Sequence, residues 1–373
     1  MIIARKLIIV AMFGVSGVSM AQVPDMLTAF DAGGKALGAG SAFNNTNVDT
    51  LSTTYNPAAL GFVNQAQAGA SMRNFPTTET RVTGPLNDLR LDSTSFSGDL
   101  RLSHFGYAAP MKRLKGSVGI AFTTGGWMND NRRGVNLPGG ISQFLDAVKL
   151  RTDFINISYG KANEDMSFAW GVGLVIASQS NFNRQNIVFS DPNIPAVSAR
   201  DSDSTFGIGV QGGVIITPRN RPNSTLSLSV RSPIQMMDDE GVNNLYTRVP
   251  ARITGGYALR QDGYRGNRDF VVYGAEVSHY LSTRSNDRVK QDAHTTAHIG
   301  IEYNYAMGMA MIPIRIGYSV VPAGGDDLGN RNSFTYGLGY RPQDKNWGIE
   351  LNFGNPTGGG KDMSIYVNYR FKS

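Results

Sequence analysis

The sequence predicts an all-β protein: a 14-stranded antiparallel transmembrane β-barrel whose lumen holds an N-terminal hatch, or plug, segment. Three observations lead to this fold class. From Ala66 onward the chain divides into segments in which apolar and polar residues alternate, the number of segments is even, and their connections are alternately long and short. Alternation with a period of two is typical of strands whose two faces meet different surroundings.

The first 21 residues have the layout of a secretory signal peptide. Arg5 and Lys6 precede an apolar core over 7–18, and small residues over 19–21 form a cleavage site. This core is too short for a membrane-spanning helix, which needs about 20 residues. We therefore expect a signal peptide over 1–21, a hatch over 22–65 and a barrel over 66–373.

Composition excludes several classes of protein. The chain has no cysteine, so it has no disulfide framework, thiol nucleophile or thiolate metal site. No segment after the first 21 residues approaches eighteen consecutive apolar residues, and the mean hydropathy is -0.22, which excludes a helical membrane protein. The formal charge of +6 comes from scattered residues, so we expect no nucleic-acid partner.

The alternating segments fit a membrane barrel better than a soluble sandwich. Phe168, Trp170 and Val172 share one strand face opposite Ala and Gly. Near the C-terminus, Ile349 and Leu351 share a face opposite Gly, Glu and Asn. Segment lengths match the roughly 9–11 residues that cross a bilayer at a tilt. The polar faces suit a wet lumen, and large aromatic residues on the apolar faces near segment ends suit an interfacial girdle.

The strand count rests on the connections. Fourteen segments start near residues 66, 94, 117, 148, 167, 202, 224, 249, 269, 292, 310, 332, 346 and 363. Membrane barrels have short periplasmic turns and longer external loops. The alternation of long and short connections follows this rule and places both ends of the barrel in the periplasm. We expect a small helix in one external loop, 129–147, around Ile141 to Val148.

One strand changes its parity. Leu100 and Leu102 share a face, whereas Phe105 and Tyr107 fall on the opposite one. A bulge near His104 would restore the register by inserting one residue. An incorrectly assigned segment would also explain the change, so both interpretations stay open.

The stretch STTYNPAALG precedes the first predicted strand. Pro57 fixes its own φ, lacks an N–H and disfavours helical geometry at Asn56, whose side chain can bond to nearby backbone in a turn. Residues 22–65 hold too few apolar residues for a core of their own. A fourteen-stranded lumen is wider than an eight-stranded one that side chains fill. We expect Asn56, Pro57 and Ala58 to hold a plug against the wall, although an ordinary turn into the first strand would also explain them.

A family resemblance adds to this interpretation. A Gly-rich stretch, an acidic position and an Asn-Pro-Ala motif together resemble the N-terminal hatch of the FadL family, which includes the PorV-like components of type IX secretion. The residues that carry the resemblance are Gly33, Gly34, Gly38, Gly40, Asp49, Asn56, Pro57 and Ala58.

The resemblance implies a bacterial outer-membrane barrel for passive uptake of hydrophobic small molecules, typically long-chain fatty acids or aromatic hydrocarbons. In that family, ligand binds among external loops, moves into the lumen near the hatch and leaves sideways into the membrane lipid. The alternative is a PorV-like component that binds secreted proteins or partner subunits of a secretion system. The external loops are short for a fatty-acid transporter and bring the chain closer in size to that branch.

Lumen-facing charges are the remaining candidates for ligand binding. By parity five arginines and three glutamates point inward: Arg101, Arg231, Arg252, Arg315 and Arg370, with Glu276, Glu302 and Glu350. Pairing with those glutamates and with the hatch is one interpretation. In the other, an arginine, Arg252 or Arg315 foremost, receives a ligand carboxylate through a bidentate bond.

Other motifs carry no chemistry in this context. The G-x-G-x-x-G over 207–212 lies inside an alternating strand rather than at the start of a helix. His294 and His298 would be about 13 Å apart on a strand, too far to share a metal ion. The acids of 238–240 and 326–327 are expected to be solvated loop residues. With no Ser-His-Asp grouping, we expect neither enzymatic activity nor a cofactor.

Overall fold

The computed structural model describes residues 35–83, 90–137, 140–237, 248–266, 268–282, 292–322, 330, 332–343, 346–357 and 361–371. The predicted signal peptide, Gly33, Gly34 and the acidic runs at 238–240 and 326–327 lie outside the described residues. In the described part of the chain, no helix is long and apolar enough to cross a membrane.

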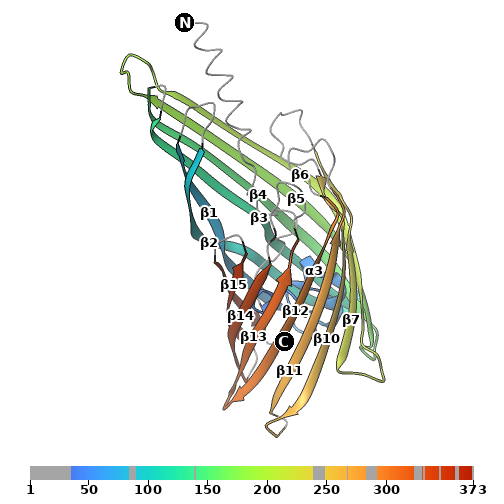
Figure 1. Cartoon of the computed structure of the whole chain (residues 1–373). Helices are drawn as coiled ribbons and strands as arrows, with labels where there is room; N and C mark the ends of the chain where they lie inside the picture. The colour runs from blue at the N-terminus through green and yellow to red at the C-terminus, as the bar shows by residue number, and fades with distance from the viewer. Residues whose placement is uncertain are drawn as a thin grey trace.

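Nearly all regular structure is strand (Figure 1). The strands are β1 (Gln67–Thr83), β2 (Arg90–Met111), β3 (Gly116–Leu137), β4 (Ile141–Ala162), β5 (Phe168–Phe189), β6 (Val197–Ile216), β7 (Ser224–Arg231), β8 (Ile234–Met236), β9 (Arg248–Val249), β10 (Arg252–Tyr264), β11 (Asp269–Tyr280), β12 (His294–Met307), β13 (Ala310–Val320), β14 (Ser333–Pro342), β15 (Trp347–Pro356) and β16 (Asp362–Arg370). The short helices are α2 (Lys35–Gly38), α3 (Ser52–Tyr55), η1 (Pro57–Phe62) and η2 (Lys112–Leu114).

The sheet closes into a barrel of antiparallel neighbours. β1 pairs with β16, and β5 pairs with β6, so the ordered sheet has no free end. The sixteen described strand segments make fourteen barrel strands, because β8 continues β7 and β9 continues β10. The predicted fourteen-stranded barrel is confirmed. Short turns and both barrel termini lie at one end, which we call the periplasmic end. The opposite end is called the outer end, and "above" means toward the outer end.

Two prolines interrupt the β7–β10 ladder. The register that pairs Arg231 with Arg252 and Ile234 with Val249 places Pro233 opposite Pro250. Neither proline has an N–H to donate, so the ladder breaks between these two pairs. β6 also changes register there, since Gln211 pairs with Arg231, whereas Gly207 pairs with Met236.

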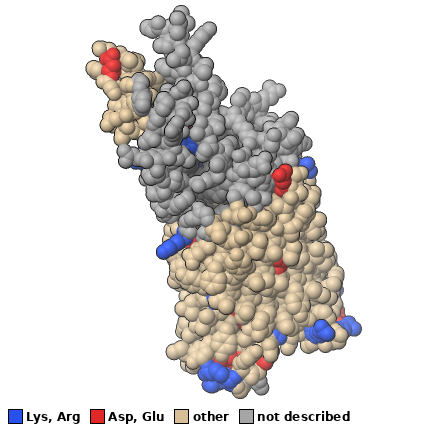
Figure 2. All heavy atoms as spheres, in the orientation of Figure 1, with Lys and Arg blue, Asp and Glu red and all other residues tan. Residues whose placement is uncertain are grey.

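The apolar strand faces point outward as predicted. Phe168, Trp170, Ile208 and Leu351 are 39%, 40%, 49% and 38% exposed, against a lumen face that is largely buried. Figure 2 shows few charged side chains across the middle of the face in view, with Lys and Arg gathered at its lower end. An apolar outer band bounded by charge is the exterior that a lipid bilayer requires.

The long strands correct one prediction. β2 to β5 each contain 22 residues, about 70 Å at roughly 3.3 Å per residue. They extend well beyond the shorter strands on the other side of the barrel (Figure 1). The helix expected around Ile141 to Val148 is wrong. This stretch belongs to β4 and pairs with β3 and β5 on its two sides, so neighbouring strands satisfy its backbone.

The predicted bulge in the second strand is confirmed. Ser71 pairs with His104 and Met72 pairs with Leu102, so Ser103 is the extra residue. Ser103 and His104 are both buried, while Leu102 and Phe105 on either side face outward. The bulge therefore keeps the apolar side chains of β2 on the lipid face above and below it.

Candidate functional site

Residues 35–65, called the inner segment below, lie within the barrel (Figure 1). Ala39, Phe43, Leu51 and Leu60 are almost fully buried. The inner segment contacts wall strands that lie far apart in the sheet, β13–β15 next to α2 and β3–β6 next to η1. The inner segment therefore spans the lumen from one part of the wall to another. The hatch role and the domain boundaries at 22–65 and 66–373 stay predictions.

Glycines of the Gly-rich stretch allow close contact with the wall. Gly38 has no room for a side chain, because a Cβ there would overlap the Asn352 amide. Gly40 has φ +65°, which favours glycine. Its N–H donates to Thr335 Oγ1 at 2.7 Å, and its carbonyl oxygen is 2.9 Å from His298 Nδ1. Backbone groups of the inner segment are thus satisfied by wall side chains.

The Asn-Pro-Ala motif forms a buried turn against β4 and β5. Asn56 Oδ1 accepts a hydrogen bond from the Ala58 N–H at 3.0 Å, and Asn56 Nδ2 donates to the Asn45 carbonyl at 3.1 Å. Pro57 begins η1. A Cβ on Gly171 of β5 would lie 2.5 Å from the Ala58 nitrogen and from the Pro57 oxygen. The turn fits only because this wall position has no side chain.

Arg315 is the centre of a buried charge network. Its side chain is fully buried, with Nε 2.6 Å from Glu302 Oε2 and Nη2 3.1 Å from Glu350 Oε1. Arg341 Nη2 lies 2.7 Å from the same Glu350 oxygen. Two arginines face two glutamates, so the network is neutral. For Arg315, pairing with glutamates is the interpretation that the geometry supports, and a role as ligand receptor is not.

Arg252 lies in a different environment, beside Arg231, a second buried arginine that the alternation also predicts to face inward. Arg252 and Arg231 are direct cross-strand partners, 6% and 4% exposed. Arg252 Nη2 donates to the Tyr55 carbonyl at 3.4 Å, and its guanidinium lies 5.9 Å from the Tyr55 ring centre. The Arg231 guanidinium lies 5.7 Å from the Phe154 ring centre. Arg231 Nη2 also donates to the Pro250 carbonyl at 3.1 Å. Like charges that lie directly opposite each other repel.

Arg101 is not brought together with the other two candidates. It is half-buried on β2 just above the bulge, whereas Arg252 and Arg315 lie on β10 and β13, which are not neighbours of β2. The three predicted arginines therefore occupy three separate environments. Sequence reasoning placed Arg231 inward but missed its pairing with Arg252, because only the register of β7 on β10 shows it.

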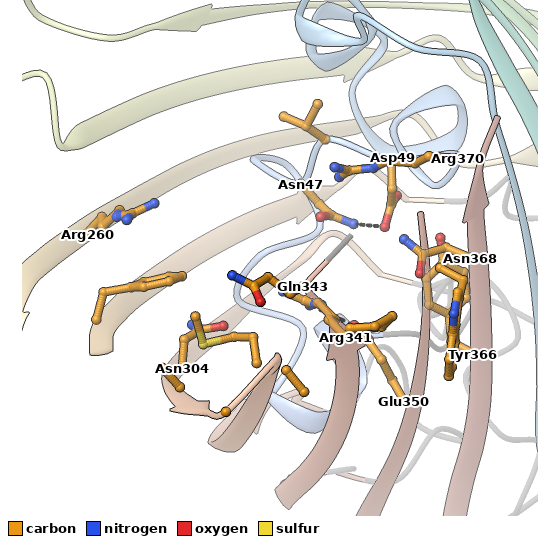
Figure 3. A pocket seen from close by; sticks show the side chains of 18 residues that line it. Asn47, Asp49, Arg260, Asn304, Arg341, Gln343, Glu350, Tyr366, Asn368 and Arg370 are labelled. Atoms are coloured by element: carbon orange, nitrogen blue, oxygen red, sulfur yellow. Dashed lines mark hydrogen bonds and ion pairs between the residues drawn. The ribbon is translucent and has the colours of Figure 1, made fainter. Parts of the chain in front are cut away.

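A cavity of about 460 Å³ lies on the periplasmic side of the inner segment (Figure 3). Asn47 and Asp49, joined by a 2.5 Å hydrogen bond, line its inner-segment side. Arg341, Glu350 and Arg370 line the barrel side. Apolar side chains such as Val48, Phe270 and Met311 complete the lining, so the cavity has a mixed character, and its charged groups lose less hydration if water fills it.

The wall is interrupted next to the inner segment. β2 and β3 pair only from Met111 opposite Gly116 up to His104 opposite Thr123. Above this last pair, β3 continues along β4 with a bulge near Gly126, and it pairs next with β1 from Asn129 onward. The β2–β3 ladder therefore stops at the height where the inner segment contacts both strands.

An apolar cluster lines the lumen face of the projecting strands. Leu137, Ile141, Phe144 and Ile187 are buried together, with Phe189 and Val197 packed against them. The even-numbered residues of β4 below them, such as Phe154 and Asn156, also face the lumen. The sequence-based prediction missed this cluster because it assigned 129–147, which holds Leu137, Ile141 and Phe144, to an external loop.

The described residues contain no group of three or more side chains that could hold a metal ion. His294 and His298 lie on one strand, as predicted, and stack or bond separately: His294 with the Tyr280 ring, and His298 with Gly40 and Thr296. The G-x-G-x-x-G motif lies inside β6, also as predicted.

Comparisons with known proteins agree on the architecture. No protein-family model matches the chain, and the search of curated proteins finds no match. Among solved structures, the Pseudomonas putida toluene transporter TodX has a TM-score of 0.61 at 14% identity, covering 94% of this chain and 99% of that one. A FadL homologue from Pseudomonas aeruginosa has a TM-score of 0.60 at 16% identity, covering 90% and 98%. The Ralstonia pickettii toluene transporter TbuX has a TM-score of 0.58 at 11% identity, covering 92% and 100%.

The chain thus has the FadL-type barrel fold over nearly its whole length. A closed antiparallel barrel with an apolar exterior and short turns at one end is the architecture of bacterial outer-membrane proteins. We therefore place the chain in a bacterial outer membrane.

Proposed function

We propose that this barrel takes up hydrophobic small molecules passively, with the inner segment as a fixed hatch and the β2–β3 interruption as the exit. The observation that carries the proposal is the position of that interruption: the ladder stops at His104 and Thr123, where the inner segment closes the lumen. A molecule moving down the lumen would meet a closed floor and an unpaired wall at the same height.

Each part of this route has a matching surface. The buried cluster of Leu137, Ile141, Phe144 and Ile187 lies on the projecting strands toward the outer end, where we propose that a hydrophobic molecule enters the barrel. Each buried CH₂ group is stabilised by about 0.8 kcal/mol, so both this cluster and membrane lipid are favourable places for an alkyl chain. The cavity beneath the inner segment, whose lining mixes charged, amide and apolar groups, offers an alkyl chain less of this gain than lipid does, which favours a sideways exit into lipid over an axial one.

Two of the structural neighbours are toluene transporters, which fits this class of solute. The buried Arg231–Arg252 pair goes further and favours a ligand with an acidic head group, such as a long-chain fatty acid. Guanidinium groups bind carboxylates through two parallel hydrogen bonds. Tyr55 and Phe154 beside the two arginines would contact the first carbons of the chain.

The test is uptake by proteoliposomes together with native mass spectrometry of the purified barrel. We expect a retained fatty acid or hydrocarbon, and saturable uptake of both an acid and an alkane of equal chain length. Arg252→Met should lower retention and uptake of the acid at least tenfold and leave the alkane unchanged. Arg260→Met, at the periplasmic end, is the matched control. A barrel that neither retains nor moves either solute would refute the proposal.

A second candidate is a secretion component that binds secreted proteins or partner subunits. The observation that favours it is the length of β2 to β5, which project beyond the membrane band as a surface for a protein. Co-purification of a protein partner from membranes that yield no retained lipid would support this candidate over uptake.

A further inference from the structure

A buried hydrogen-bond chain links the inner segment to the last β2–β3 pair. His104 Nε2 is 3.0 Å from Thr50 Oγ1 of the inner segment. His104 Nδ1 is 3.3 Å from Thr123 Oγ1 of β3, and that hydroxyl is 3.0 Å from Thr54 Oγ1, again in the inner segment. The chain therefore passes from the inner segment to β2, to β3 and back.

The hydrogen-bond chain is anchored at both of its ends. Thr50 Oγ1 lies 3.4 Å from the Tyr366 hydroxyl of β16, and Asn156 Nδ2 of β4 donates to Thr54 Oγ1 at 3.4 Å. His104, Thr50 and Thr123 are at most 1% exposed. Water cannot replace these bonds without opening the site, so removing one partner leaves a buried polar group unsatisfied.

The β2 bulge makes this chain feasible. Ser103 is the inserted residue, and it turns His104 into the lumen where regular alternation would have placed an outward residue. Gly106 contributes space, because a Cβ there would come within 2.9 Å of His104 Nε2 and of Thr50 Cβ. Above His104 the ladder has no further β2–β3 pair.

We propose that His104 is a positioning residue that sets the lower limit of the β2–β3 interruption by clamping its last pair to the seated inner segment. While Thr50 and Thr54 are in place, the interruption cannot extend further down the wall. The residue thereby fixes the height at which the exit begins. This inference rests on the proposed function for its consequence, whereas its geometry is testable without transport.

The first test measures the distance between spin labels on the outer surface, in a chain that has no native cysteine. In the upper label pair, Leu102 on β2 lies just above the last β2–β3 pair and is measured against Ile155 on β4, one residue below that level. In the lower label pair, Tyr107 and Ile157 lie level with each other on either side of Ile120, below the last β2–β3 pair. His104→Ala should move the upper pair to longer and broader distances and leave the lower pair unchanged. Equal shifts in both pairs, or in neither, would overturn the proposal.

Isosteric variants separate this role from general stability. Thr50→Val removes one hydroxyl from the hydrogen-bond chain and should reproduce the shift of the upper label pair. Thr50→Ser keeps a hydroxyl and should restore the native distance between the upper labels. Thr254→Val, which removes a buried hydroxyl bonded to Ser278 at 2.8 Å elsewhere in the barrel, is the matched control and should shift neither pair. A shift without any hydrophobic uptake would support the clamp and refute the proposed function. Uptake without a shift would do the reverse.

Discussion

Gly171 on β5 gives the sharpest test of how the inner segment is seated. An added Cβ would lie 2.5 Å from both the Ala58 nitrogen and the Pro57 oxygen, whereas ordinary contacts of this kind begin near 3.4 Å. In Gly171→Ala the Asn-Pro-Ala turn must therefore move by roughly 1 Å. Overpacking of this kind costs about 1–3 kcal/mol.

This cost destabilises the seated state, in which the Asn-Pro-Ala turn of the inner segment packs against the wall, and leaves the barrel itself unaffected. Since 1.4 kcal/mol is a factor of ten in an equilibrium constant, the unseated population should rise about 5- to 150-fold. We expect a matching rise in the frequency of ion-conducting openings in planar lipid bilayers. Replacing glycine by alanine also lowers the conformational entropy of the unfolded chain. The control variant described next shares this effect, so it cancels in the comparison.

The control is Gly255→Ala on β10, where no atom lies within 4 Å of the added Cβ. It should open no more often than wild type. Both variants should keep the heat-modifiable mobility of a folded barrel in gel electrophoresis. A folded Gly171→Ala barrel with wild-type conductance would refute the claim that the turn is held against this wall.

Three further predictions concern the interior and the periplasmic turns. Arg315→Met leaves two buried glutamates without their central cation and should lower the free energy of unfolding in vesicles by about 3–5 kcal/mol, read from urea transitions; a loss under 1 kcal/mol would contradict the network. Asn56→Ala removes both bonds that hold the turn, and should cost the seated state about 1–3 kcal/mol, seen as more frequent openings; unchanged openings would count against the motif. Hydrogen bonds from Ser167 and Arg219 lower the pKa of Asp165 to about 2. The stabilising effect of Asp165 is therefore complete above its ordinary pKa of 3.8 and is lost only as the pH falls toward 2. The melting-temperature difference between wild type and Asp165→Asn should therefore be constant from pH 5 to 8. A difference that vanishes within that range would disprove the pairing.

Much of the fold was predictable because each strand separates lipid from lumen. The alternation at Phe168 and Ile208 reports that boundary directly, and the parity change before Phe105 located the bulge. The same rule failed at Ile141 to Val148, where the strands leave the membrane and both faces lose their fixed environments. There the pairing with β3 and β5, which no local pattern encodes, decides the structure.

The site was less predictable, because its features depend on register and on the inner segment. Parity correctly turned Arg252 and Arg315 inward, but only cross-strand partners show that Arg315 meets two glutamates and Arg252 meets Arg231. In the sequence, His104 was notable only because the alternation of apolar and polar residues changes parity near it. Its bonds to Thr50 and Thr123 join residues from three separate parts of the chain, which one sequence does not reveal.

The central claim is that hydrophobic solutes leave sideways above an inner segment that stays seated. Asn45 Cβ lies 3.2 Å from the Cβ position of Gly256 on β10, close to the roughly 3.5–4.5 Å of a disulfide. Uptake of a long-chain fatty acid by proteoliposomes of the N45C/G256C variant, oxidised and then reduced, is the most direct measurement. The account predicts equal uptake in both states, and uptake that stops on oxidation and returns on reduction would contradict it.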